Sequence, residues 1–152
     1  MTAPRIDVEG MEEAQKKMAA LAKRYSRATV EGAIAAGHLV RSEAIKSIHD
    51  QSSGEQVVRT RTGGGEYTHT ASKPGDAPNT DTGRLVQSVQ VEVTGKTVDV
   101  GSTLHYAAHL EFGTRKMYAR PWLFPAFDGN KAAIVKLIKH GIDDVTKKHG
   151  DL

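Results

Sequence analysis

Two histidines four residues apart are the strongest candidates for chemistry in this sequence. His105 and His109 lie in the string HYAAHLE, which also contains Glu111. In a helix, a four-residue step places both imidazoles on one face, as zinc sites require. The string departs from the HExxH motif because Tyr106 stands where the general base would be. A zinc hydrolase is therefore one hypothesis, but no third ligand is marked, and we expect neither a metal nor a cofactor.

Other catalytic patterns are missing from the sequence. The chain has no cysteine, which excludes a cysteine nucleophile, a thiolate zinc site and a disulfide framework. No serine lies in a GxSxG elbow. The three glycines at 63–65 lack the Lys-Ser/Thr of a phosphate-binding loop, so we interpret them as a turn. We expect a protein that is not an enzyme.

Basic residues offer a second kind of chemistry. Arg59 and Arg61 would share one face of a strand, with Lys73 nearby. They are either charges that discourage strand aggregation or contacts to an acidic neighbour or DNA phosphates. A small nucleic-acid-binding module is thus an alternative function. The net charge of +3 comes from 21 basic and 18 acidic residues of interspersed sign, which is typical of an ordinary surface.

Length and composition predict one domain over residues 1–152, of which 38% are hydrophobic. No apolar run approaches the roughly 20 residues of a membrane-spanning helix. The first residues contain no apolar segment typical of a secretory signal. We expect no contact with a membrane.

The N-terminal third has helical periodicity. Apolar residues recur at three- and four-residue steps over 9–22 and again over 27–49, and the two helices either join or break near Ser26. Gly32 and Gly37 lie inside the second helix, where glycine is unfavourable. We interpret both as sites of close packing against a neighbouring helix.

Residues 51–80 differ in character and predict a protruding arm followed by a loop. Runs rich in β-branched residues at 57–62 and 66–70 flank the glycines of 63–65, which is typical of a hairpin. Both faces are largely polar, and an isolated hairpin is marginally stable in water. We therefore expect the arm to be mobile in a monomer and ordered against a partner.

Regular structure returns after residue 80. Asp81 or Thr82 would cap a short helical turn. Alternating valines over 89–94 and 97–101, around Gly95, predict an antiparallel hairpin with one apolar face. A short helix over 104–112 and a final helix over 128–148, capped by Asp128, complete the chain, with residues 149–152 frayed. The predicted fold class is α+β, with N-terminal helices, an antiparallel β-sheet, a hairpin arm, a short helix and a C-terminal helix.

Most aromatic residues are concentrated in one segment. Residues 106–127 contain six of the eight aromatics in the chain, together with Arg115, Lys116 and Arg120. Pro121 and Pro125 in this segment are candidate helix starters. Aromatics and arginine dominate the energetics of protein–protein interfaces. The aromatics are either the core of the domain or part of a contact surface, and both can hold.

Two strings carry a family resemblance. HYAAHLEFGTRKMYARPWLFPAF resembles the pattern YAxxxEFGT followed by a basic residue, ARPFL and PA, and DTGRLVQSV resembles TGxLxxSI. Both patterns are typical of the neck, or tail-completion, proteins of HK-type long-tailed bacteriophages, also described as minor tail or head–tail joining proteins. The resemblance covers almost the whole chain. Trp122 departs from the usual Phe, and the arm of 51–80 falls where this family varies most.

The resemblance implies a structural virion protein, with no catalysis and no cofactor, in the neck or tail of the particle and in the host cytoplasm during assembly. Its implied partners are further copies of itself in a ring of six or twelve, the head-closure or connector proteins, the tail terminator or tail tube, and DNA that passes without specific binding. A tail terminator ring is the alternative within this class. The matching motif positions are Thr82, Gly83, Leu85, Ser88, Tyr106, Ala107, Glu111, Phe112, Gly113, Thr114, Ala119, Arg120, Pro121, Trp122, Leu123, Pro125 and Ala126.

Residue types suggest roles for several of these positions. We expect Gly113 to adopt the left-handed helix-stop conformation. Phe112, Trp122 and Leu123 are expected to pack against the valine face of the sheet, and Glu111 is expected to form an ion pair with Arg120. The arm is interpreted as a subunit contact that uses Val57, Arg59, Arg61 and Tyr67.

Overall fold

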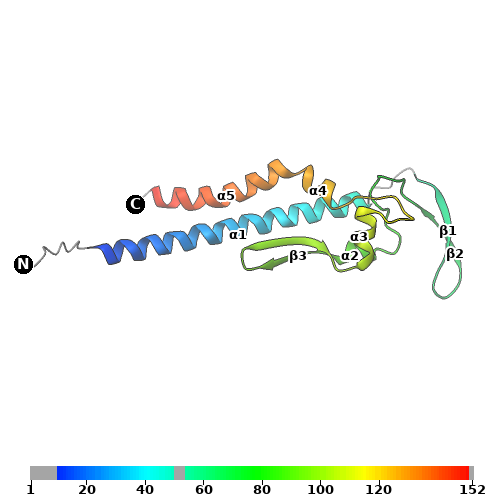
Figure 1. Ribbon diagram of the computed structural model, residues 1–152, viewed down its shortest axis with the longest axis horizontal. Helices are drawn as coiled ribbons and strands as arrows, with labels where there is room; N and C mark the ends of the chain where they lie inside the picture. The colour runs from blue at the N-terminus through cyan, green and yellow to red at the C-terminus, as the bar shows by residue number, and fades with distance from the viewer. Residues whose placement is uncertain (1–9, 50–53, 151–152) are drawn as a thin grey trace, which may run out of the picture.

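The computed structural model describes residues 10–49 and 54–150 and has the α+β architecture expected from the sequence. The longest helix lies between a C-terminal helix on one side and a β-hairpin on the other, and a second hairpin protrudes at the far end (Figure 1). The elements are α1 (Met11–His49), β1 (Gln56–Thr60), β2 (Glu66–Thr70), α2 (Arg84–Ser88), β3 (Val89–Thr94), β4 (Thr97–Ser102), α3 (His105–Phe112), α4 (Phe124–Asp128) and α5 (Lys131–Gly150).

Helix α1 is a single helix and does not break at Ser26. Its 39 residues correspond to a length of about 58 Å. No proline interrupts it, and the exposed ion pair of Arg27 with Glu31 links successive turns just after Ser26. The buried residues of α1 begin only at Ala28. The first ten residues of the helix are all exposed, so this end projects from the body of the protein.

Helices α1 and α5 pack closely because glycines face the opposing backbone. A Cβ atom on Gly32 would lie 2.8 Å from Ile138 Cα, and one on Gly141 would lie 2.7 Å from the Ala28 carbonyl oxygen. Both distances are shorter than side chains tolerate, so only glycine permits this approach. The predicted helix contact of Gly32 is confirmed.

The prediction for Gly37 is wrong in its partner. A Cβ atom on Gly37 would lie 3.0 Å from side-chain atoms of Val91 and Val98, so this glycine faces the β3–β4 hairpin and not a helix. Helix α1 is therefore covered on two sides, and its glycines allow close packing against α5 on one side and against the β3–β4 hairpin on the other. The predicted antiparallel hairpin is confirmed, with Val91 opposite Val100 and Val93 opposite Val98.

The arm forms a separate two-stranded antiparallel sheet, as predicted, and protrudes from the body (Figure 1). Arg59 lies opposite Tyr67, and Val57 lies opposite His69. The turn at 63–65 consists of three glycines with positive φ. The loop of 72–79 contains no helix or strand, and residues 51–53 lie outside the described ranges.

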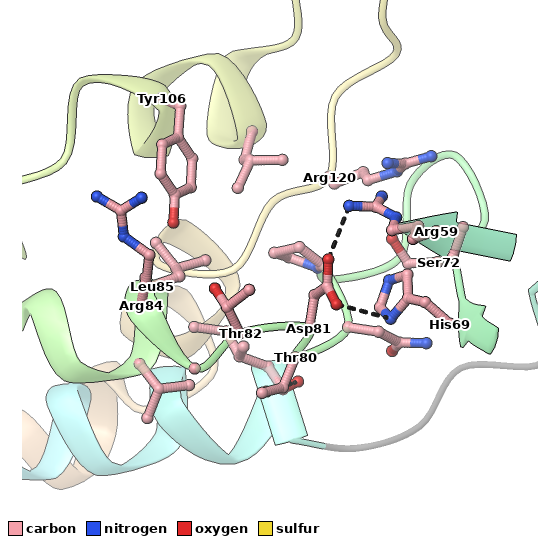
Figure 2. A pocket seen from close by; sticks show the side chains of 17 residues that line it. Arg59, His69, Ser72, Thr80, Asp81, Thr82, Arg84, Leu85, Tyr106 and Arg120 are labelled. Atoms are coloured by element: carbon pink, nitrogen blue, oxygen red, sulfur yellow. Dashed lines mark hydrogen bonds and ion pairs between the residues drawn. The ribbon is translucent and has the colours of Figure 1, made fainter. Parts of the chain in front are cut away.

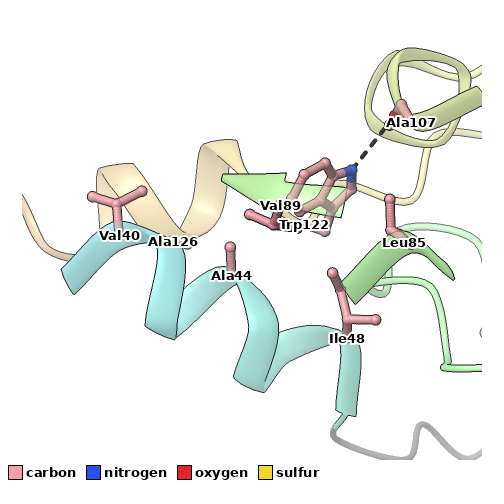
Figure 3. Packing of buried hydrophobic residues seen from close by; sticks show 8 residues of the cluster. All are labelled: Val40, Ala44, Ile48, Leu85, Val89, Ala107, Trp122 and Ala126. Atoms are coloured by element: carbon pink, nitrogen blue, oxygen red, sulfur yellow. Dashed lines mark hydrogen bonds between the residues drawn. The ribbon is translucent and has the colours of Figure 1, made fainter. Parts of the chain in front are cut away.

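The hydrophobic core lies at the C-terminal end of α1 (Figure 3). Trp122 is 2% exposed and occupies its centre, and short helices and β3 supply the surrounding side chains. The indole N–H of Trp122 points at the Ala107 carbonyl oxygen, at 3.5 Å. The cluster comprises Val40, Ala44, Ile48, Leu85, Val89, Ala107, Trp122 and Ala126.

The C-terminal region differs from the prediction at its helix boundaries. Asp128 does not cap the last helix, because it ends α4 and forms an ion pair with Lys131 at the start of α5. Pro125 lies in the first turn of α4 as expected, whereas Pro121 lies outside any helix. Helix α5 continues to Gly150, and residues 151–152 lie outside the described part. Among the described helices, no segment combines the length and the hydropathy that a membrane-spanning helix requires.

Candidate assembly interface

Glu111 connects α3 to the segment that follows it. Its carboxylate accepts backbone N–H bonds from Trp122 at 2.8 Å, Leu123 at 3.0 Å and Phe124 at 2.8 Å. These donors lie at the entry to α4, where N–H groups have no partner within the helix. The predicted ion pair of Glu111 with Arg120 is therefore wrong. The carboxylate satisfies three converging backbone donors instead.

Replacing Glu111 with glutamine tests this role. The amide keeps the size of the side chain but loses its charge and one of two acceptor oxygens, so at least one of the three backbone donors loses its partner. We expect the free energy of unfolding to fall by about 1–3 kcal/mol, measured by urea denaturation. The matched control is Glu31→Gln, which removes an exposed ion pair and should change stability by less than about 1 kcal/mol. Equal effects of the two changes would contradict the role of Glu111.

Helix α3 turns Ala107 and Glu111 toward the core and Phe112 away from it. Ala107 and Glu111 are four residues apart and share a face, whereas Phe112 is five residues from Ala107 and lies about 140° around the helix. Phe112 is accordingly 81% exposed, so its predicted packing against the valine face is wrong. Helix α1 covers that face instead, through the contact of Gly37 with Val91 and Val98.

Trp122 and Leu123, which were also predicted to pack against the valine face, do lie inside the protein. Trp122 is buried and packs with Val89 at the start of β3, and Leu123 is partly buried against the same cluster. Gly113 has positive φ as expected, but its φ of 75° with ψ of −178° lies outside the left-handed helical region. Glycine is required here because a Cβ would also lie 2.8 Å from the Ala119 nitrogen.

Four aromatic side chains between residues 112 and 127 are exposed, and we term them together the aromatic surface. Phe112 is 81% exposed, Tyr118 79%, Phe124 64% and Phe127 45%. Only Trp122, among the aromatics from 106 to 127, is buried. The sequence left open whether this segment is core or contact surface. The structure assigns Trp122 to the core and leaves the aromatic surface open to solvent.

Asp81 anchors the arm. Its carboxylate binds the Arg59 guanidinium at 2.7 Å and accepts a 2.7 Å hydrogen bond from the Tyr67 hydroxyl. That hydrogen bond raises the pKa of Tyr67 above its ordinary value of 10.0. Asp81 and Thr82 do not cap α2, because Gly83 occupies the cap position, with φ of 74°, and no side chain bonds there. The Asp81 carboxylate therefore binds residues of the arm, which are distant in sequence, and does not cap the helix that follows it.

The arm arginines have partners within the chain. Arg59 pairs with Asp81, and the Arg61 guanidinium lies 5.4 Å from the centre of the Tyr67 ring. Val57 is partly buried and shares the inner face with Tyr67, whereas Val58 on the outer face is 66% exposed. These contacts give the arginines a structural role and do not favour the alternative of a nucleic-acid-binding module.

Deleting residues 57–70 should leave a folded protein with weakened self-association. No residue of the core cluster lies in the arm. The cut ends already meet, because the Ala71 N–H donates to the Glu55 carbonyl oxygen at 2.8 Å. We expect circular dichroism and the unfolding midpoint to change little, while the mass in solution, measured by light scattering, shifts toward the monomer. An unchanged oligomer mass after deletion would contradict the arm as a subunit contact.

Motif residues and arm residues meet around a cavity of about 360 Å³ (Figure 2). Thr82, Gly83 and Leu85 come from the first motif, and Tyr106 and Arg120 from the second. Arg59 and His69 reach it from the arm. The sequence did not identify Arg84, Ser72 or Thr80 as neighbours of this cavity, since no periodic pattern links their positions.

The remaining motif positions have structural roles. The Ser88 hydroxyl bonds the Ser102 hydroxyl at 2.7 Å, which joins α2 to the end of β4. Thr114 pairs with Met117 in an isolated β-bridge that holds the turn after α3. Pro121 precedes Trp122 in the irregular segment between α3 and α4 that Glu111 binds.

The candidate zinc ligands do not form a site of three ligands. His105 and His109 are exposed on α3, whereas Glu111 is engaged by backbone donors. Among the described residues, no group of three His, Cys, Asp or Glu side chains is arranged to hold a metal ion.

The chain was also compared with models of known protein families, with curated proteins and with solved structures, and none of the three comparisons finds a match. The resemblance to tail-completion proteins therefore rests on the two motif strings and the order of the elements.

Proposed function

We propose that this chain is a structural virion protein of a long-tailed bacteriophage, a neck or tail-completion component that joins the head connector to the tail tube. It would form part of a ring around the DNA channel. The two motif strings support this proposal, together with the positions their residues take. Leu85 and Trp122 lie in the core, Glu111 holds the entry to α4, and Tyr106 and Arg120 line the cavity.

The observation that carries the proposal is the aromatic surface. Four large aromatics stand exposed within 16 residues of sequence, beside the exposed basic residues Arg115 and Lys116. Aromatics with arginine are the commonest hot-spot residues of protein interfaces. A subunit that assembles with other proteins accounts for this surface.

Two further surfaces support an assembling subunit. The arm protrudes from the body, and the N-terminal end of α1 projects with Met11 52% and Met18 72% exposed. A ring needs a heterologous interface, in which two different surfaces of each copy meet. The arm and the N-terminal end of α1 lie at opposite ends of an elongated molecule (Figure 1), so they are two such different surfaces. A tail terminator ring would use the same surfaces, so the proposal extends to that position as the alternative.

Co-assembly tests the proposal. The purified protein is measured by light scattering across concentration, alone and together with the connector and tail-tube proteins encoded by the same phage. We expect a discrete ring, or a monomer that joins the connector or the tail tube. An unrelated α+β protein of similar size serves as the control for nonspecific association. A protein that remains monomeric and joins neither the connector nor the tail would refute the proposed function.

A further inference from the structure

The cavity between the arm, α2 and α3 is electropositive. Its wall contains Arg59, Arg84 and Arg120 but only one carboxylate, that of Asp81. Asp81 is already bound to Arg59. Among the described residues, no carboxylate lies within ion-pair distance of Arg84 or Arg120. The cavity therefore has two guanidinium groups available to an anion.

Buried donors at this cavity have no acceptor. Ser72 is 5% exposed, and neither its hydroxyl nor the Nε of Arg120 has a hydrogen-bond partner among the described residues. Buried unsatisfied donors are costly, so they favour a ligand that supplies acceptor oxygens. Figure 2 places Arg84 and Tyr106 at one end of the cavity, with Arg59 and Arg120 at the other. This separation suits two anionic groups better than one.

A matching pair of carboxylates lies elsewhere on the same chain. Glu92 on β3 and Asp99 on β4 are directly opposite each other, and both are exposed on the face of the hairpin that points away from α1. Like charges directly opposite in a sheet destabilise it. No arginine, lysine or histidine of the described residues forms an ion pair with either carboxylate. The pair is therefore suited to cations supplied from outside the chain.

We propose that the cavity binds carboxylates, and that Glu92 and Asp99 of a second copy of this chain supply them. Each copy then presents the acidic pair on the hairpin and the basic cavity beside the arm, which are two different surfaces and so make a head-to-tail contact. Arginine binds carboxylates with two parallel hydrogen bonds, which fixes the register of such a contact. This inference rests on the proposed ring and names the side chains that join its subunits.

Cavity shape favours a protein carboxylate over DNA. A cavity of about 360 Å³ accepts a few side-chain atoms. A DNA duplex is instead bound along a line of phosphates by an extended basic face. Acceptance of the acidic pair would add charge-assisted bonds to Arg84 and Arg120 and remove the repulsion between Glu92 and Asp99.

Charge reversal tests the contact. Arg84→Glu and Asp99→Arg both change exposed positions, so the fold should persist, which circular dichroism verifies. Self-association is followed by sedimentation equilibrium up to about 1 mM protein. We expect each single reversal to raise the dissociation constant about tenfold or more, and the double variant to recover most of the loss. Glu92→Arg provides a second partner for Arg84→Glu, and Lys139→Glu on α5 is the charge-matched control.

Other outcomes would overturn this inference in distinguishable ways. Additive effects of the two reversals would exclude direct contact between them. Wild-type protein that stays monomeric at every concentration, and whose co-assembly with connector and tail proteins is unchanged by either reversal, would exclude the second copy, while the proposed neck function would still be decided by that co-assembly. A third outcome is that free succinate binds the cavity, that Arg84→Glu abolishes this binding, and that Arg84→Glu and Asp99→Arg show no coupling in self-association. This outcome would assign the cavity to a carboxylate from another source. Duplex DNA binding that is lost in Arg84→Glu, with self-association unchanged, would assign it to phosphates.

Discussion

Replacing Trp122 with alanine is expected to lower the free energy of unfolding by about 3–5 kcal/mol. The indole is 2% exposed and belongs to a core cluster to which α1, α2, β3, α3 and α4 all contribute side chains. Its removal would leave a cavity among Ala44, Leu85 and Val89 that these short elements cannot close without losing other contacts. Since domains are stable by only about 5–15 kcal/mol, this loss is large.

Urea denaturation of Trp122→Ala, with circular dichroism as the signal, measures this effect. Tyr118→Ala is the matched control, because Tyr118 lies in the same segment but is 79% exposed, and it should change stability by less than about 0.5 kcal/mol. Trp122→Phe keeps a ring in the core and should cost less than about 1.5 kcal/mol. A Trp122→Ala variant as stable as Tyr118→Ala would show that Trp122 does not hold the core together.

Replacing Phe112 and Phe124 with serine is expected to abolish assembly while the fold remains. Both side chains are more than half exposed and lie outside the core cluster, so the stability of the monomer should change by less than about 1 kcal/mol. Each interface hot spot contributes about 2 kcal/mol or more, so loss of both should weaken association about 1000-fold. This prediction rests on the proposed function.

Sedimentation velocity of the double serine variant, alone and with connector and tail-tube proteins, measures the change in assembly. Val135→Ser is the control, because Val135 is also apolar and 49% exposed but lies on α5 outside the aromatic surface. Assembly of the double variant with wild-type affinity would exclude the aromatic surface as an interface. Loss of the folded state would instead place Phe112 or Phe124 in the core.

Regular elements were predictable because their signals are local. The alternating valines of 89–94 and 97–101 indicated both the hairpin and its apolar face. The periodicity of 27–49 indicated part of the buried face of α1, namely Gly37, Val40, Ala44 and Ile48. Helix boundaries were less predictable. Asp81 and Asp128 both resemble N-caps in sequence, but each carboxylate binds a cation instead, Arg59 in one case and Lys131 in the other.

Local patterns in the sequence predicted the α+β class, the two hairpins and the helical α1, α3 and α5. All of these follow from periodicity, turn residues or backbone sterics within a short stretch of chain. The partners of side chains that act over long distances followed only from the packing of the whole fold. It placed Glu111 on the backbone of 122–124, Asp81 on the arm, and Gly37 against β3 and β4.

The same distinction applies to the aromatic segment and the cavity. Composition showed that aromatics and arginines are concentrated over 106–127, but not which of them are buried. That choice depends on the face of α3 that meets the core, and once Ala107 and Glu111 face inward, Phe112 must face solvent. Arg84 and Arg120 likewise line one cavity only when α2, α3 and the arm pack at the end of α1. Backbone hydrogen bonds and core packing bring these segments together, and the local spacing of residues in the sequence does not.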